Sequence, residues 1–307
     1  MTLPTLAQAP RGIWPAVNVS RWPRLDPLSA LPPLTLLHLL LHAPEAWYLR
    51  APLIGLFLLG AVFRRWLRTP PFWYLTATLL GTSVYLHWES ADNHKYLFVY
   101  WCLALCCAFS LPKQQQRASL AISSRWLIGL CMALATVWKL CQLQYLDGTF
   151  FQYCFLEDER FAHFTARFAD LPLQNLADNR QLRDLLTSGH LQGLDMTRVT
   201  LTGAAQLASL SWFFTWWTVF IEGALALGFL LPNSRWTALI RNGLLILFGM
   251  TTYGLAPVRG FGWMLMLLGL AQCQAREIEF RYGYLFALLL IQAYTLPLAE
   301  IVTALAK

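Results

Sequence analysis

The chain has 307 residues, of which 57% are hydrophobic and 13% are charged, and its mean hydropathy is +0.47. A soluble domain carries about 25% charged residues, so this composition excludes an ordinary soluble protein and indicates a protein that uses the bilayer as its solvent. The net charge of +7 lies mainly in short connections between apolar runs. Basic connections orient membrane helices, and we therefore expect no nucleic-acid partner.

Apolar runs recur along the chain and predict an all-α integral membrane protein with about nine transmembrane helices. A hydrocarbon core of about 30 Å needs roughly 20 helical residues, and fewer where aromatic or basic anchors flank the run. The first run contains a proline pair and the eighth is short, so these two are the weakest of the set. The predicted spans are 28–44, 46–64, 71–88, 95–111, 120–141, 207–231, 236–255, 258–274 and 282–300.

The basic connections predict the orientation of these spans. If the polar, proline-broken residues 1–27 form a cytoplasmic N-terminal segment without a cleaved signal peptide, then RRWLR at 64–68 and PKQQQR at 112–117 also fall on the cytoplasmic side. The outer side receives WESADNHK and the loop 145–206, whose leucine spacing predicts a small helical cap. Residues 28–307 are then one transmembrane domain.

Lys139 and His94 are both predicted at the outer membrane boundary. Lys139 follows Leu120, the expected start of the fifth span, by about 28 Å along a helix axis. It is either an amine that reaches up to the lipid headgroups or a desolvated base, since burial lowers a lysine pKa from about 10.4. His94, at the start of the fourth span, is either an ordinary interfacial residue or part of the same site.

Glu222 lies deep inside the sixth span, where a carboxylate must be protonated, paired or facing a polar cavity. A transporter with Glu222 as its proton site is one interpretation, although the sequence shows no inverted repeat. Arg259 is expected on the outer side, where it can pair with Asp92 or Glu89 or contact a lipid phosphate.

The seven cysteines are scattered, without a CxxC pair or the Cys/His spacing of zinc sites, so we expect no metal. Cys141 lies at the outer end of the fifth span, and Cys154 lies just outside it. A disulfide between them is possible if that side of the membrane is oxidising.

Three stretches taken together resemble one family. They are RWPRLDPLSAL (21–31), ESADNHKYL (89–97) and VWKLCQLQYLDG (137–148). In order and spacing they are similar to the vitamin K-dependent gamma-carboxylase-like membrane proteins, also called the HTTM (horizontally transferred transmembrane domain) family, over roughly residues 20–275. The shorter members that this chain resembles are bacterial, and one of them matures a secreted toxin. The resemblance therefore implies a multi-pass protein of the bacterial inner membrane.

The resemblance also implies a chemistry. Lys139 matches the base that activates a reduced quinone for attack on oxygen, and His94 matches a second active-site residue. We expect a reduced quinone as cofactor, and the oxidised product then drives modification of a periplasmic peptide or a lipid. The residues expected to line the substrate site are Trp138, Glu89, Asp92, Asn93, Glu222 and Arg259.

Two departures from the family argue against glutamate carboxylation. Gly249 stands where the carboxylase has a functional histidine, and the large lumenal domain of the carboxylase has no counterpart in residues 1–307. The alternative function is a non-catalytic membrane subunit, or a toxin-maturation or partner-docking protein, that holds a membrane protein complex through its outer cap. Lys139 would then be a lipid anchor, and membrane lipids are partners under either hypothesis.

Overall fold

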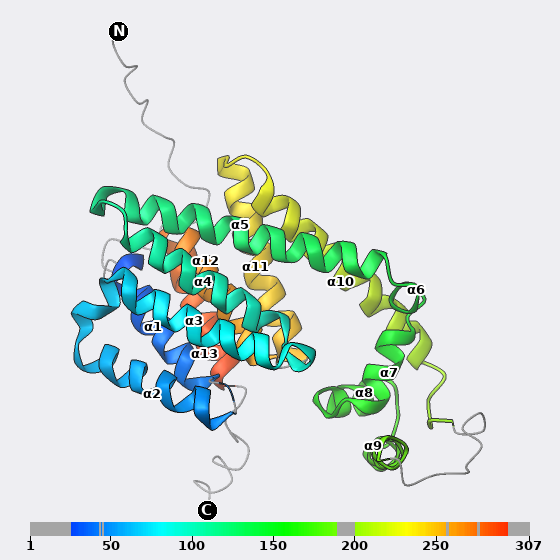
Figure 1. The fold of residues 1–307 in the computed structure, drawn as a ribbon. Coiled ribbons are helices and arrows are strands. Elements are labelled where there is room, and N and C mark those ends of the chain that lie inside the picture. The colour runs from blue at the N-terminus through cyan, green and yellow to red at the C-terminus, as the bar shows by residue number, and fades with distance from the viewer. Residues whose placement is uncertain are drawn as a thin grey trace, which may run out of the picture.

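The computed structural model describes residues 26–42, 44, 46–188, 200–255, 258–274 and 277–293. These residues form 13 α-helices and short 3-10 turns, without a β-strand in the described ranges (Figure 1), which confirms the all-α prediction. Most of the predicted N-terminal segment 1–27 lies outside them. So do residues 189–199 of the outer loop and 294–300 of the ninth predicted span.

Each predicted span corresponds to a helix. Pro27 and Pro70 each occupy the first helical position, where the fixed φ of proline suits the first turn and its missing N–H costs nothing. The helices are α1 (Pro27–Leu41), α2 (Trp47–Val62), α3 (Pro70–Leu86), α4 (Asn93–Phe109), α5 (Lys113–Leu140), α10 (Leu207–Leu230), α11 (Arg235–Leu255), α12 (Arg259–Gln272) and α13 (Ile278–Ala293).

Two of these helices could cross a membrane. In the described part of the chain, only α5 and α10 are long and apolar enough by length and composition. The apolar helices α1 and α2 have 15 and 16 residues, hence about 22 and 24 Å, which is short of a hydrocarbon core of about 30 Å. The structure thus shows helices at the predicted places and supports two crossing helices rather than about nine.

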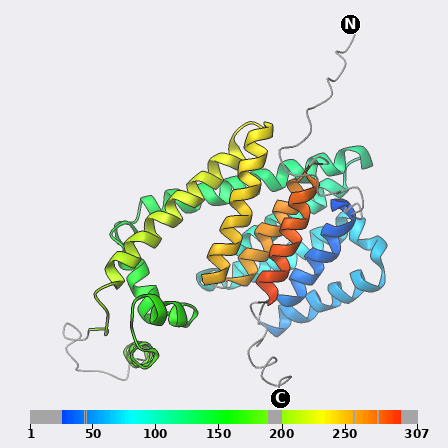
Figure 2. The same ribbon diagram turned by 180° about the vertical axis from the view of Figure 1, so that it is seen from behind.

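The long helices α5 and α10 pack side by side and extend past the other seven, which form a bundle against them (Figures 1 and 2). A Cβ atom at Gly129 of α5 would lie 2.8 Å from Leu230 Cδ2, so the glycine allows the two helices to approach closely. A short 3-10 helix, η2 (Arg64–Arg68), joins α2 to α3 at one end of the bundle.

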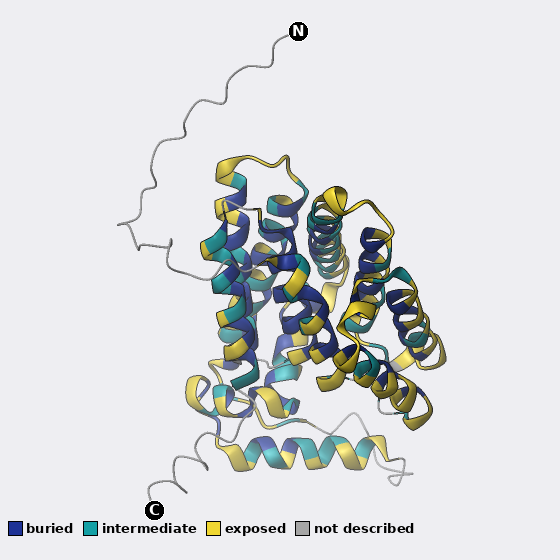
Figure 3. Ribbon diagram, turned by 90° about the vertical axis from the view of Figure 1, so that its left-hand side faces the viewer, coloured by how far each residue is buried: buried dark blue, intermediate teal, exposed yellow. Residues whose placement is uncertain are grey.

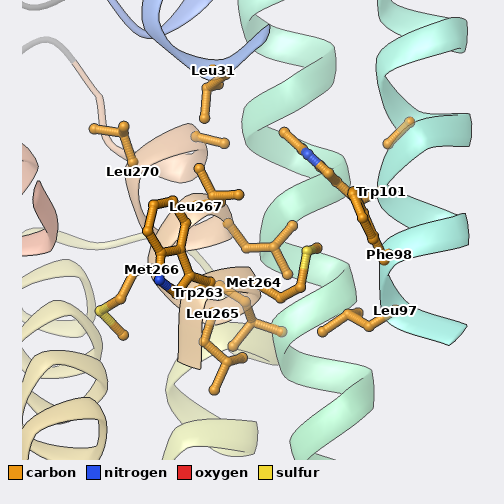
Figure 4. Close-up of a cluster of buried hydrophobic side chains, with 14 of the residues drawn as sticks. Leu31, Leu97, Phe98, Trp101, Trp263, Met264, Leu265, Met266, Leu267 and Leu270 are labelled. Carbon is orange, nitrogen blue, oxygen red and sulfur yellow. The ribbon is translucent and has the colours of Figure 1, made fainter. Parts of the chain in front are cut away.

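Helix α12 is the centre of the bundle, although its sequence predicted one of the weakest spans. Every residue from Gly262 to Gln272 is buried, and α1, α4, α5, α11 and α13 all contact it. Figure 4 shows the buried cluster to which Trp263, Met264 and Leu267 of α12, Leu31 of α1 and Trp101 of α4 all belong. A helix that is apolar on all sides is expected in such a core.

Four short helices lie at the far end of α5, in the stretch where a helical cap was predicted. They are α6 (Leu143–Leu146), α7 (Thr149–Glu157), α8 (Ala162–Phe168) and α9 (Leu173–Thr187). Gly148 precedes α7 with φ of +87°, a conformation that favours glycine. Phe151 and Phe155 pack with Phe214 of α10 into a core separate from that of the bundle. Helix α9 lies crosswise to the bundle helices, end-on in Figure 1 and lengthwise in Figure 3.

Candidate functional site

Lys139 and Glu222 form an ion pair between α5 and α10. The Lys139 Nζ atom donates a hydrogen bond to Glu222 Oε2, and the two side chains are only 17% and 10% exposed. Lys139 lies in the last turn of α5, whereas Glu222 lies in the second half of α10. The sequence singled out both residues, but not their contact, which joins positions 83 residues apart.

Tyr145 of α6 covers this pair from the side of the cap. Its ring centroid lies 5.4 Å from Lys139 Nζ, a favourable cation–π distance. The Tyr145 hydroxyl lies 2.6 Å from Thr218 Oγ1, and Thr215 Oγ1 donates to the Tyr145 carbonyl at 3.3 Å. Burial raises the pKa of Tyr145 above its usual value, so its phenol stays neutral. These contacts hold the ring over the pair.

Cys131 of α5 and Tyr253 of α11 lie within electrostatic range of Glu222. Tyr253 of α11 is 2% exposed, and its hydroxyl has no hydrogen-bond partner among the described residues. Burying a hydroxyl without a partner is costly. The hydroxyl is therefore available to a ligand or water that reaches the site.

His94 belongs to a second group of polar side chains. Its ring packs on the start of α12, where a Cβ atom at Gly260 would lie 2.7 Å from His94 Nε2. The Asp92 Oδ2 atom is 3.8 Å from His94 Nδ1, too far for a hydrogen bond. The His94 side chain is 14% exposed and that of Asp92 is 68% exposed, so the histidine is inside and the carboxylate outside.

Two further histidines, His38 and His42, accompany His94 and were not predicted as site residues. Their rings lie 4.8 Å apart, and the ring of His38 stacks on Trp263 at 6.1 Å. His38 is fully buried, and in the described part of the chain neither of its ring nitrogens has a hydrogen-bond partner. The same holds for the Trp263 indole nitrogen. The spacing HLLLH could have indicated that the two histidines lie together, since residues four apart share a helix face.

The lysine pair and the histidine group are separate in the structure. Lys139 contacts α10 and α6, whereas His94 contacts α12, and within the described ranges no hydrogen bond, ion pair or ring contact joins the two residues. Tyr253 lies between the two groups. A Cβ atom at Gly262, two residues after the contact of Gly260 with His94, would be 2.9 Å from the Tyr253 ring.

The other predicted site residues lie at the surface. Trp138 is 68% exposed, so it does not cover the neighbouring Lys139. Glu89, Asn93 and Arg259 are also exposed, and Arg259 has His42 within electrostatic range. Only Glu222 of the predicted lining set contacts Lys139 in the described part of the chain.

Gly249 of α11 packs against Met266. A Cβ atom there would lie 2.8 Å from the Met266 terminal carbon, so the position has no room for a histidine unless the methionine moves. The glycine that replaces the histidine of the carboxylase therefore allows α11 to pack closely on α12 at Met266.

The thiols of Cys141 and Cys154 are both free, so the structure has no disulfide between them. Cys141 is exposed, whereas Cys154 is partly buried in the cap. Burial raises the pKa of Cys154 to about 11. Among the described residues, no three His, Cys, Asp or Glu side chains are arranged to hold a metal ion.

Comparison of the chain with models of known protein families, with curated proteins and with solved structures finds no match. The resemblance to the carboxylase-like family thus stays a prediction from three sequence stretches.

Proposed function

We propose that this protein is a vitamin K carboxylase-like membrane enzyme in which Lys139 and Glu222 remove a proton from a quinol or a similar lipid-soluble reductant. The observation that supports this function best is the ion pair itself, because it places an amine and a carboxylate together in a site that water hardly reaches. A lysine serving only as a lipid anchor needs no buried carboxylate.

The surfaces of α5 and α10 support a membrane location. Only 28% and 39% of their apolar windows are buried inside the protein, whereas a core helix of a soluble protein is mostly buried. The proposed location is the bacterial inner membrane, with the N-terminus on the cytoplasmic side.

The pair suits proton transfer for an electrostatic reason. In a site with little water, the ammonium of Lys139 can pass a proton to Glu222, which leaves a neutral amine beside a carboxylic acid. The amine then takes a hydroxyl proton from the quinol and becomes an ammonium again, next to the quinolate that it has produced. Glu222 stores the first proton throughout this step.

Oxidation follows deprotonation in the proposed reaction. The quinolate gives two electrons and its remaining hydroxyl proton to dioxygen, which yields a quinone and a hydroperoxide anion. The hydroperoxide is then the oxidant for modification of a peptide or lipid on the outer side. The hydroxyl of Tyr253, which has no partner among the described residues, supplies a hydrogen-bonding group for an oxygen substituent of a head group. Exclusion of water protects the reactive anion.

The kinetic test uses purified protein in nanodiscs with a reduced short-chain quinone. We expect dioxygen consumption by the natural protein, loss of at least a hundredfold in the Lys139→Ala variant, and a smaller loss in Glu222→Gln. Trp138→Phe is the matched control, since Trp138 neighbours Lys139 but is exposed. Circular dichroism and size exclusion establish that each variant is folded.

Unchanged turnover in folded Lys139→Ala would refute the function. Absence of turnover in the natural protein, together with a stoichiometric partner and no bound quinone, would instead support the non-catalytic subunit.

A further inference from the structure

The basic connections meet at one end of the bundle. Arg68 of η2 donates to Ser29 Oγ at 3.1 Å, and Ser29 donates to Asp26 at 2.8 Å, so the connection before α3 lies beside the start of α1. Arg281 in α13 lies within electrostatic range of Asp26 and of Arg117 in α5. These contacts bring together segments that are far apart in the sequence.

Arg241 is the most deeply buried cation at this end, with 1% of its surface exposed. Its Nε donates to Gln272 Oε1 at 3.1 Å and its Nη1 donates to Asn233 Oδ1 at 2.9 Å. The carboxylate of Glu277 is 3.9 Å from Nη2, beyond hydrogen-bond reach. Its guanidinium also lies 5.8 Å over the ring of Phe229. Neutral groups therefore make most of the close contacts of this buried charge.

Arg117 and Arg281 lie near the same residue, Cys273, as Arg241 does. The thiol of Cys273, the residue after α12, interacts electrostatically with the carboxylate of Glu277 and with all three arginines. Arg281 Nη2 donates to the carbonyls of Gln274 at 2.7 Å and Cys273 at 3.3 Å. The Nη2 atom of Arg117 is buried and has no hydrogen-bond partner among the described residues, although the side chain as a whole is only half-buried.

We propose that this arginine group, made of Arg117, Arg241 and Arg281, binds a phosphate-bearing anion, with Arg117 as the residue that contacts it. A guanidinium forms paired hydrogen bonds with phosphate oxygens, and the unused Nη2 atom of Arg117 provides a donor for them. Basic pockets at helix ends bind the head groups of anionic lipids in this way.

Capping of α12 is the simpler role that these arginines could have. Cations near a helix C-terminus stabilise its exposed carbonyls, and Arg281 does so through Cys273 and Gln274. That role accounts for Arg281 but not for Arg117, whose buried donor reaches no carbonyl in the described part of the chain. The phosphate proposal rests on Arg117 and is independent of the quinol proposal.

The test is a binding titration with the full chain in a neutral detergent, monitored by native mass spectrometry. Phosphatidylglycerol is the anionic probe and phosphatidylcholine the zwitterionic one. We expect stronger binding of phosphatidylglycerol, and about fivefold weaker binding in Arg117→Gln. Arg65→Gln is the matched control, because it removes the same charge from an exposed arginine of η2. It should leave the affinity nearly unchanged.

Further arms identify the source of the phosphate. Displacement of phosphatidylglycerol by millimolar inorganic phosphate would assign the site to a soluble anion, and failure to displace it would assign the site to a lipid head group. Arg117→Lys keeps the positive charge but loses the planar set of guanidinium N–H donors, so it should give an intermediate affinity. This variant replaces Arg117→Gln in the test if Arg117→Gln does not fold. Equal binding of the two lipids, or equal effects of Arg117→Gln and Arg65→Gln, would overturn the proposal. Lys139→Ala should not change this affinity.

Discussion

The ion pair between Lys139 and Glu222 predicts a specific pattern of stabilities in a double-mutant cycle. Lys139→Met keeps the length of the side chain and removes its charge, which leaves the carboxylate of Glu222 without its partner in a side chain that is 10% exposed. Removing one partner of a buried pair costs about 3–5 kcal/mol, most of it from the charge left behind. We therefore expect Lys139→Met to lower the free energy of unfolding by about 3 kcal/mol at pH 7.

The double variant, Lys139→Met with Glu222→Gln, contains no buried charge. It should be less destabilised than the sum of the two single variants, by at least about 1 kcal/mol. Lowering the pH should reduce the cost of Lys139→Met, because protonation of Glu222 removes the unpaired charge. A lysine that reaches out to lipid headgroups would show neither effect.

The assay is reversible unfolding in mixed micelles, followed through the fluorescence of the 14 tryptophans. The four proteins of the cycle must refold to the same spectrum. Additive effects, within about 0.5 kcal/mol, would mean that the two side chains do not interact, and the reasoning from burial would be refuted.

Packing and thiol chemistry give two further predictions. Gly269→Ala should lower the free energy of unfolding by about 1–3 kcal/mol in the same assay, because the added Cβ atom would lie 2.5 Å from the fully buried ring of Tyr284. An unchanged stability would contradict this packing of α12 on α13. Maleimide should label Cys141 much faster than Cys154 at pH 7.5, because Cys141 is exposed and burial raises the pKa of Cys154 to about 11. The labelling of Cys154 should accelerate as the pH rises toward that value. Peptide mapping by mass spectrometry measures both rates, and equal rates at pH 7.5 would contradict the burial of Cys154.

The helices could be predicted from the sequence because apolar runs and prolines act locally. Pro27 and Pro70 start helices at the expected places, and the leucine spacing of the cap gives α9. Helix α5 begins at Lys113, seven residues before the predicted start of its span, because polar residues such as glutamine also form helix and a hydropathy window ignores them. Hydropathy therefore located the helices better than it located their ends.

The candidate site could be predicted only in part, because its contacts are between distant segments. Polarity within an apolar run marked Glu222, and position at a span end marked Lys139, but neither signal reveals that they pair. His38 was passed over for the same reason, since the side chains that bury it come from α4 and α12. Trp138 was expected beside Lys139 as its sequence neighbour, yet successive helical residues point in different directions and it is exposed.

The proposed chemistry requires a head group next to the amine of Lys139. The most direct measurement is an experimental structure of the protein in nanodiscs after addition of a quinone. A head-group oxygen about 2.6–3.2 Å from Lys139 Nζ, with Glu222 still in contact with the amine, is the expected result. A quinone bound elsewhere, or an amine that contacts only lipid phosphates while Glu222 faces another partner, would contradict the proposed role of the pair.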